Sequence, residues 1–563
     1  MCLQKWSAKS SALKIKIILA LYLKEKPENL HQISKGRILK LKSPYLLLVS
    51  NIYGGIFLRK RRFIKNALLL TITGLILRFV VVFFRIWLSN LIGAEGMGLY
   101  QVIISVHVFA SAFAASGLMT AVTRQVADRL SVNDKKGAIR AFRMSVLLTL
   151  LVAFLSLIII FIFAEQIAVL FIKDIRAVPA LKTLSFSLPF MGVASCFKGY
   201  FLARRNAKRP SAALILEQAV RILLVFVLCK EAIKISLSYA AAAVLLADCI
   251  SEAVSMLYMA IGYYKDKKAI KNNSKTERYI KILKENLRIS MPITAGKYLA
   301  TFLRTVENIL MPQSLAKYTS SYKSSLSQFG MIKGMALPIL FFPASLLNSI
   351  TTLLIPEVSE AKANNDYKTI KNAVIKSFQI ALCSAYIIGG IFLINAKELG
   401  VLIYSSEEVG YLIKALAPLV PIMYLDSMAD GLLKGLDKQN NTLVHGLIDS
   451  VFRISFIYFL VPSFGMKAFL GIMFISNILT CSLNSITLLK HSKVKFDLNG
   501  WVIKPIFSLI ISLSLSYLLM IPFKNLPNLI FILLFSTLSI IIYIVLLYYL
   551  KVFTKNQVSS LYK

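Results

Sequence analysis

The stretch "ALILEQAVRILLVFVLC" (residues 213–229) is apolar enough to lie in a lipid bilayer, yet Glu217 and Arg221 interrupt it. A second copy follows in "LVHGLIDSVFRISFIYFL" (residues 443–460), where Asp449 and Arg453 hold the same two places. The shift is the same for both, since 449 − 217 = 453 − 221 = 232, and we call it the repeat offset. It also relates Pro189 to Pro421, Gly199 to Gly431, and Asn133-Asp134 to Asn365-Asp366. One offset sustained over roughly a hundred residues indicates an internal repeat.

The composition around this repeat is that of a polytopic membrane protein. Apolar residues make up 57% of the 563-residue chain and the mean hydropathy is +0.70, whereas soluble domains contain about 45–50% apolar residues. Apolar runs of roughly 20 residues, the length that a spanning helix needs, predict an all-α fold with about fourteen transmembrane helices. We expect them near 67–90, 98–122, 144–164, 181–203, 211–229, 237–262, 288–311, 329–355, 372–395, 410–432, 440–461, 466–489, 501–521 and 529–550.

The distribution of Lys and Arg predicts the orientation of these helices. Alternate loops are rich in cations, as in "RKRRFIK" before the first helix and "ARRNAKR" after the fourth. The loops between them are poor in cations, and "SNLIGAEGMG" has none. Because Lys and Arg accumulate in cytoplasmic loops, we expect both termini in the cytoplasm. This pattern accounts for the net charge of +40, and no nucleic-acid-binding motif accompanies it.

The repeat predicts the domain organisation. The repeat unit contains six helices, and an even number of crossings returns the chain to the side where it began. The second unit therefore starts on the same side as the first, and we expect the two lobes to be related by an axis along the membrane normal. We expect an N-terminal lobe at 63–264, a basic cytoplasmic linker at 265–287 and a C-terminal lobe at 288–490. Residues 491–563 then hold two further helices and a cytoplasmic tail. Residues 1–62 read as a basic cytoplasmic or interfacial extension, because their longest apolar run, about 15 residues, is too short to span.

Charged residues inside the spans are the first candidates for function, because a charge at the bilayer centre costs at least about 2.5–3.5 kcal/mol on insertion scales. In the pairs Glu217–Arg221 and Asp449–Arg453 the i,i+4 spacing places opposite charges on one helix face. Two interpretations remain open, a structural ion pair within each lobe or a site for a coupling cation, either a proton or sodium. Asp449 is the favoured cation site because polar residues could lie near it, namely His445, Asn477, Thr480 and Asn484.

A second set of charges is purely cationic. "RFVVVFFR" carries Arg78 and Arg85, and the similar "KYLATFLR" carries Lys297 and Arg304. In each segment the two cations are seven positions apart and so share a helix face. They have no carboxylate at helical spacing except Glu307, which could pair with Arg304.

We interpret these four cations as a binding surface for a diphosphate in a central cavity, because cationic side chains bind phosphate oxygens and Arg does so bidentately. The alternative is that they reach the lipid headgroups. It applies more to Arg85 and Arg304, which fall near the predicted outer ends of their helices. No cofactor motif is present, and the six Cys and four His show no metal-ligand spacing.

The sequence also resembles a known family. "LIGAEGMGLYQ" (residues 91–101) and "LEQAVR" (residues 216–221) are similar to segments of the stage V sporulation protein B group of polysaccharide flippases. That group belongs to the superfamily of multidrug and toxin extrusion (MATE) transporters. The resemblance, over about residues 63–555, implies two six-helix lobes facing a central cavity in a bacterial cytoplasmic membrane. It implies an undecaprenyl-linked saccharide as substrate, membrane lipids as surroundings and alternating access as mechanism.

Two other functions compete with this one. A cation-coupled drug exporter of the MATE type would have the same fold, but the excess of cations disfavours it, since such exporters need acidic cavities for cationic drugs. An enzyme acting on polyprenyl phosphates would need carboxylates or His on outer loops for acid–base chemistry. The longest predicted outer loop, "PQSLAKYTSSYKSSLSQ", has neither. We therefore expect a transporter with no enzymatic activity, active in cell-wall, spore-cortex or polysaccharide synthesis.

Overall fold

The computed structural model describes residues 44–268, 279–523 and 525–552, and the part of the chain so described is helical with no strand. The chain divides into two compact units, Met1–Leu70 and Thr71–Lys563. All that follows concerns the second unit. Helices are the expected result, since inside a bilayer each backbone N–H and C=O group must find its partner within the protein.

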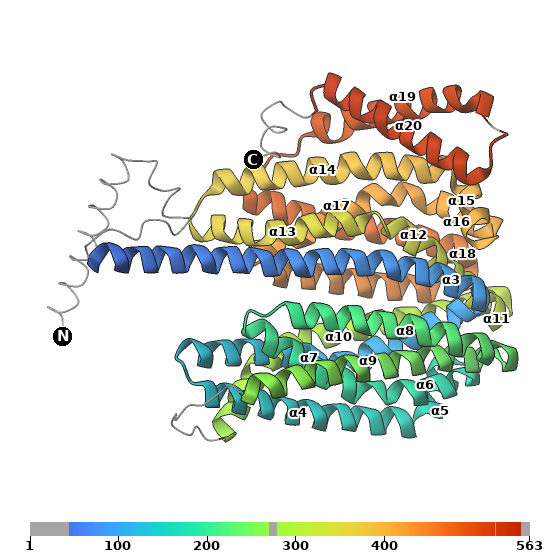
Figure 1. The fold of residues 1–563 in the computed structure, drawn as a ribbon. Coiled ribbons are helices and arrows are strands. Elements are labelled where there is room, and N and C mark those ends of the chain that lie inside the picture. Colours follow the sequence, from blue (N-terminus) through green and yellow to red (C-terminus); the bar gives the residue numbers. More distant parts are fainter. Residues whose placement is uncertain (1–43, 269–278, 524, 553–563) are drawn as a thin grey trace. The chain divides into compact units, whose positions relative to one another are not determined.

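The first half of the second unit runs from α3 to α9. Its elements are α3 (Pro44–Ser131), α4 (Lys135–Ile162), α5 (Ala164–Gln166), η1 (Ile167–Ile172), η2 (Ile175–Ala177), α6 (Val178–Ser185), α7 (Ser187–Ala203), α8 (Lys208–Ile235) and α9 (Leu237–Lys268). α8 and α7 both pack along α9, and α4 packs along α7 (Figure 1). We call these elements, from Thr71 to Lys268, the N-half.

The C-half runs from α10 to α18. Its elements are α10 (Tyr279–Thr319), α11 (Tyr322–Gly330), η3 (Met331–Ala336), α12 (Leu337–Phe341), α13 (Ala344–Ala363), α14 (Tyr367–Ile394), α15 (Ala396–Tyr404), α16 (Glu407–Leu416), η4 (Ala417–Leu419), α17 (Val420–Gly435) and α18 (Gln439–Ser492). After it come η5 (Asn499–Ile503), α19 (Lys504–Met520), η6 (Ile521–Phe523) and α20 (Asn528–Tyr549). α17 packs along α13, α14 and α18, while α19 and α20 pack on each other and on α14 (Figure 1).

Two of the helices are each a pair of helices joined at a glycine. α3 breaks at Gly93 (φ 70°, ψ −178°) and α18 breaks at Gly465 (φ 60°, ψ −139°), in conformations that glycine adopts without strain. α18 has 54 residues, and at about 1.5 Å per residue it is far longer than one bilayer crossing of roughly 30 Å. The sequence predicted both breaks, since separate spans are expected on either side of each glycine.

The structure tests the number of spans in part. Within the described residues, ten helices are long and apolar enough to cross a membrane, or eleven if the pair Tyr322–Phe341 and Ala344–Ala363, bent by 58°, is one span. α10 is not among them, although the expected span 288–311 lies within it. The all-α membrane fold is confirmed, and the count of fourteen stays a prediction.

The expected extension at 1–62 is described only in part. Residues 1–43 lie outside the described residues, and α3 begins at Pro44. The expected domain boundaries stay predictions. Of the other expected boundary regions, residues 269–278 of the linker and the tail from 553 also lie outside the described residues.

The backbone confirms the internal repeat. Three pairs of non-glycine residues with positive φ are each separated by the repeat offset, namely Asn133 and Asn365 (61° and 56°), Lys173 and Ser405 (61° and 52°), and Arg205 and Asp437 (56° and 53°). Asp134 and Asp366, separated in the same way, accept backbone N–H hydrogen bonds as the N-caps of α4 and α14. The hydrogen bonds from Thr369 hold the pKa of the exposed Asp366 carboxyl below its usual value. Turn geometry and capping therefore recur with the sequence offset.

The two halves meet in a reciprocal contact at one end of the bundle. α9 ends and α10 begins at the linker end, and Gly98 and Gly330 lie at the opposite end, which we call the far end. A Cβ atom built on Gly98 would lie 2.0 Å from the carbonyl oxygen of Leu326, and one built on Gly330 would lie 2.0 Å from that of Ala94. Since 326 − 94 and 330 − 98 both equal the repeat offset, each half presents the same backbone surface to the other. Such self-complementarity is the property of a two-fold interface.

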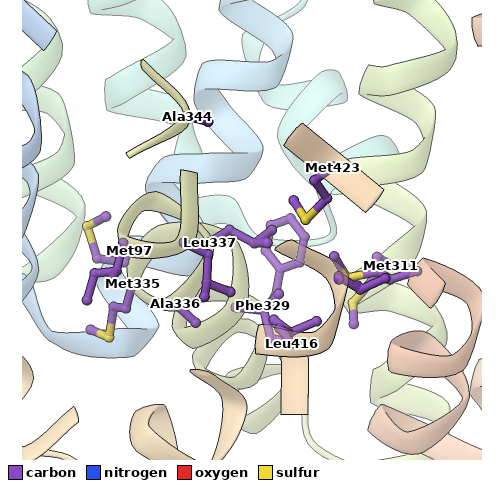
Figure 2. Close-up of a cluster of buried hydrophobic side chains, with 14 of the residues drawn as sticks. Met97, Met311, Phe329, Met335, Ala336, Leu337, Ala344, Leu416 and Met423 are labelled. Atoms are coloured by element: carbon purple, nitrogen blue, oxygen red, sulfur yellow. The ribbon is translucent and has the colours of Figure 1, made fainter. Parts of the chain in front are cut away.

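Apolar side chains from both halves surround this contact. Met97 of α3 is fully buried and would touch a Cβ on Gly334 of η3 at 3.0 Å. Phe329, Met335 and Met311 complete the cluster (Figure 2). The flexible thioether side chains fill irregular gaps between helices. The far end is thus closed by direct backbone packing inside an apolar core.

We expect the substitutions Gly98→Ala and Gly330→Ala to destabilise the protein by similar amounts, because each added methyl group meets a backbone carbonyl that cannot move aside. Overpacking of this kind typically costs about 1–3 kcal/mol. Gly446→Ala is the matched control, since nothing lies within 4 Å of its Cβ position. Thermal unfolding of the purified variants measures the effect. Equal midpoints for Gly98→Ala and Gly446→Ala would contradict the contact.

Candidate functional site

Charged side chains in the N-half gather between α7, α8 and α9. Arg221 of α8 lies 3.4 Å from the carboxylate of Glu217 and forms a closer ion pair with Asp248 of α9. Lys198 of α7 lies 3.6 Å from Glu217. Glu252, one turn after Asp248, is buried and has no hydrogen bond to Oε2. We call these five residues the N-half charge cluster.

A corresponding cluster in the C-half joins α10, η3 and α18. Arg453 lies 3.0 Å from Glu307 and 3.5 Å from Asp449, and its Nε donates a hydrogen bond to Ser476 at 2.6 Å. Ser476 in turn donates to Asp449. Lys333 lies 3.2 Å from Glu307. We call Glu307, Lys333, Asp449 and Arg453 the C-half charge cluster.

The predicted i,i+4 pairs are therefore present, but they are not the main contacts. The shortest carboxylate contact of each arginine comes from another helix, Asp248 of α9 for Arg221 and Glu307 of α10 for Arg453. Helical spacing could predict the partner on the same helix, whereas the partners across helices depend on packing that no spacing reveals. Glu307 pairs with Arg453 and Lys333 rather than with Arg304, the partner suggested by spacing.

The polar residues expected near Asp449 serve a different carboxylate. His445 Nδ1 and Asn484 Oδ1 are 2.8 Å apart, and Asn484 Nδ2 donates to Asp426 of α17 at 2.8 Å. Asn477 and Thr480 bond backbone carbonyls of their own helix. Asp449 instead has Ser476 and Arg453 as partners. His445 and Asn484 therefore form no hydrogen bond with Asp449 in the described structure, and the assignment of Asp449 as a cation site stays a prediction.

Residues of α3 and α10 form hydrogen bonds across the seam between the halves. Arg78 is exposed, and its Nη1 donates a 3.1 Å hydrogen bond to the carbonyl oxygen of Ser345 in the C-half. Tyr298, next to Lys297, donates a 3.1 Å hydrogen bond to the carbonyl oxygen of Phe113 in the N-half. Phe113 and Ser345 are again separated by the repeat offset. Arg78 and Tyr298 therefore contact equivalent positions of the opposite half.

The other two cations lie further along the same helices. Arg85 is partly buried and interacts electrostatically with Tyr100 of the N-half and Tyr404 of the C-half. Arg304 is exposed and lies within electrostatic range of Glu307 and Lys333. Among the described residues none of the four cations forms an ion pair, while the cations of both charge clusters do.

Comparison with known proteins decides the family. The family model described as polysaccharide biosynthesis protein matches residues 63–362. The chain belongs to this family. The chain is also similar to stage V sporulation protein B and, in its fold, to MATE transporters, as the following comparisons show.

Two relatives come from Bacillus subtilis (strain 168). Stage V sporulation protein B is 26% identical over 72% of this chain and 80% of its own length. Sporulation protein YkvU is 25% identical over 78% of this chain and 98% of its own length. This polysaccharide biosynthesis protein is thus similar to sporulation proteins over most of its length.

Solved structures show the same fold. An inward-facing multidrug resistance MATE transporter superposes with a TM-score of 0.57 at 16% identity, covering 75% of this chain and 98% of that one. A transporter of the same superfamily from Pyrococcus furiosus, described as having a binding pocket of reverse polarity, superposes with a TM-score of 0.54 at 17% identity, covering 76% and 96%. At this identity the likeness establishes the fold alone.

We expect Glu307→Gln to destabilise the protein by about 3–5 kcal/mol, the usual cost of removing one partner of a buried ion pair, because Lys333 and Arg453 would lose their shared carboxylate. The same substitution at Glu231, which pairs with Lys234 on the surface, should leave the unfolding midpoint unchanged. Thermal unfolding in one detergent compares the two variants. Equal midpoints would show that the C-half cluster does not depend on Glu307.

Proposed function

We propose that this chain is a flippase that moves a lipid-linked oligosaccharide or peptidoglycan precursor across the bacterial cytoplasmic membrane. The observation that supports the proposal is that four cations of α3 and α10, Arg78, Arg85, Lys297 and Arg304, form no ion pair within the described residues, unlike the cations of the two charge clusters. Family membership and the similarity to two sporulation proteins support a role in cell-wall, spore-cortex or polysaccharide synthesis.

The chemistry of these cations fits a diphosphate. At an effective dielectric near 20, opposite unit charges about 4 Å apart attract by roughly 4 kcal/mol. A diphosphate between Arg78 and Lys297 would meet cations from both halves, whereas the cations of the charge clusters already have carboxylate partners. A cationic drug would be repelled by the same four residues. A cation-coupled drug exporter therefore remains the second candidate function. The fold of this chain favours it, and the positive charge of these four residues disfavours it.

The mechanism that we propose is alternating access between two lobes, 63–264 and 288–490, with the helices of 491–563 outside the repeat. In this structure the Gly98–Gly330 contact joins the halves at the far end. Opening there requires the separation of two equivalent backbone surfaces and of the neighbouring ion pair between Glu95 and Lys323. With both termini in the cytoplasm, as the loop charges predict, the far end faces the cell exterior. The headgroup crosses between the lobes while the polyprenyl chain stays in lipid.

We expect Arg78→Ala to abolish complementation of cells depleted of the protein while the variant still accumulates in the membrane. Arg78→Lys should retain part of the activity, because the charge survives but the bidentate fork is lost. Lys230→Ala, at an exposed lysine near the end of α8, should complement fully. Lipid-linked saccharide precursors, which accumulate when the flippase fails, give the readout. Normal complementation by Arg78→Ala would refute the assignment.

A further inference from the structure

The first turns of α10 carry a cationic groove at the linker end. Its volume is about 410 Å³, and its lining residues are Ile280, Lys281, Lys284, Glu285 and Arg288. We call it the α10 groove. Lys281, Lys284 and Arg288 are exposed and stand at positions i, i+3 and i+7, so they share one face of the helix. Sites for small ligands in proteins have volumes of about 300–1,000 Å³, and the groove falls within this range.

The charge of the α10 groove is positive. Glu285, the acid among its lining residues, is already held by Arg129 of the N-half at 2.9 Å. Within the part of the chain that the structure describes, neither Lys284 nor Arg288 forms an ion pair. Ammonium and guanidinium groups bind phosphate oxygens through charge-assisted hydrogen bonds. The groove therefore suits an anionic ligand, and a phosphate above all.

The α10 groove faces away from the N-half. On the other side of the helix, Asn286 is fully buried, and its Oδ1 accepts a 3.0 Å hydrogen bond from Ser145 of α4. Asn286 is two positions from both Lys284 and Arg288. At about 100° per residue, it therefore points roughly 160° away from each of them. A ligand in the groove thus lies outside the seam between the halves.

Exposed apolar side chains flank the α10 groove. Ile280 and Met291 are 67% and 66% exposed, and Leu287 is exposed beside them. They occupy positions i, i+7 and i+11, which form one stripe along the helix next to the cations. α10 has 41 residues, about twice the roughly 20 that one crossing needs, so its charged start extends beyond the hydrocarbon core. An apolar stripe beside cations is typical of helices at headgroup level, whose apolar side chains lie among the acyl chains.

We propose that the α10 groove binds the headgroup of an anionic glycerophospholipid in the leaflet at the linker end. The phosphate of this lipid binds Lys284 and Arg288, and its acyl chains lie along Leu287 and Met291. Basic pockets beside transmembrane helices bind anionic lipid headgroups in this way. The site does not depend on the proposed function, because the proposed substrate has to enter the seam and the groove faces away from it.

Charge and shape together select this occupant. A zwitterionic phospholipid has its own ammonium group, which the cations of the groove repel. A free phosphate would use these cations but not the exposed apolar stripe. A polyprenyl diphosphate could use both, and its binding is therefore an outcome that the experiment has to separate from the binding of a phospholipid.

Native mass spectrometry of the purified full chain counts bound lipids and gives their dissociation constants. We expect phosphatidylglycerol to bind more tightly than phosphatidylcholine. The double substitution Lys284→Ala/Arg288→Ala should weaken the binding of phosphatidylglycerol about 30-fold, the loss expected when two cations near an anionic headgroup are removed. The matched control Lys368→Ala/Lys371→Ala removes the same charge from two exposed lysines at the start of α14, outside the groove, and should bind phosphatidylglycerol as the native chain does.

Three results would overturn the site. They are equal affinities of the native chain for the two phospholipids, an equal loss of affinity in the two alanine variants, and a tighter binding of undecaprenyl diphosphate than of phosphatidylglycerol that Lys284→Ala/Arg288→Ala abolishes. The last result would assign the groove to the proposed substrate. The unfolding midpoint without lipid checks that each variant is folded. Lys284→Arg/Arg288→Lys, which keeps both charges, should bind phosphatidylglycerol like the native chain and so separates a loss of charge from a change of shape.

Discussion

A charged side chain inside a bilayer needs a partner, and this requirement shapes each half of the protein. Arg221 and Arg453 occupy equivalent places in the repeat, and each is held by a carboxylate of its own helix and a closer one from a neighbouring helix. Removing one partner of such a pair leaves an uncompensated charge in a region of low dielectric, and this destabilises the protein by several kcal/mol. The ion pairs therefore fix how the helices within each half are packed.

Between the halves the contacts also involve the backbone. The Gly98–Gly330 approach is a backbone contact, and at the seam Arg78 and Tyr298 donate hydrogen bonds to carbonyl oxygens of the opposite half. The backbone positions that these contacts use recur through the repeat offset. Small residues allow close backbone approach between membrane helices. Ion pairs join the halves as well, Glu95 with Lys323 and Arg129 with Glu285, so a motion that parts the halves at either end must also part these charges.

The sequence predicted the fold class, the repeat and the presence of both i,i+4 pairs, because each depends on local pattern or on a single offset. It could not predict that Asp248 and Glu307 provide the closest carboxylates, since these contacts depend on how helices face one another. It named His445 and Asn484 as polar neighbours of Asp449, but it could not predict that His445 and Asn484 bond each other and that Asn484 donates to Asp426.

The central claim is that the two halves move as equivalent bodies about the seam. Distances between spin labels on repeat-equivalent residues measure this motion, with Leu170 and Leu402 at the far end and Val132 and Asn364 at the linker end. All four residues are exposed, and the described native cysteines are buried. On addition of undecaprenyl diphosphate, the account predicts that one distance lengthens while the other shortens. Distances that both stay constant, or both change in the same direction, would contradict it.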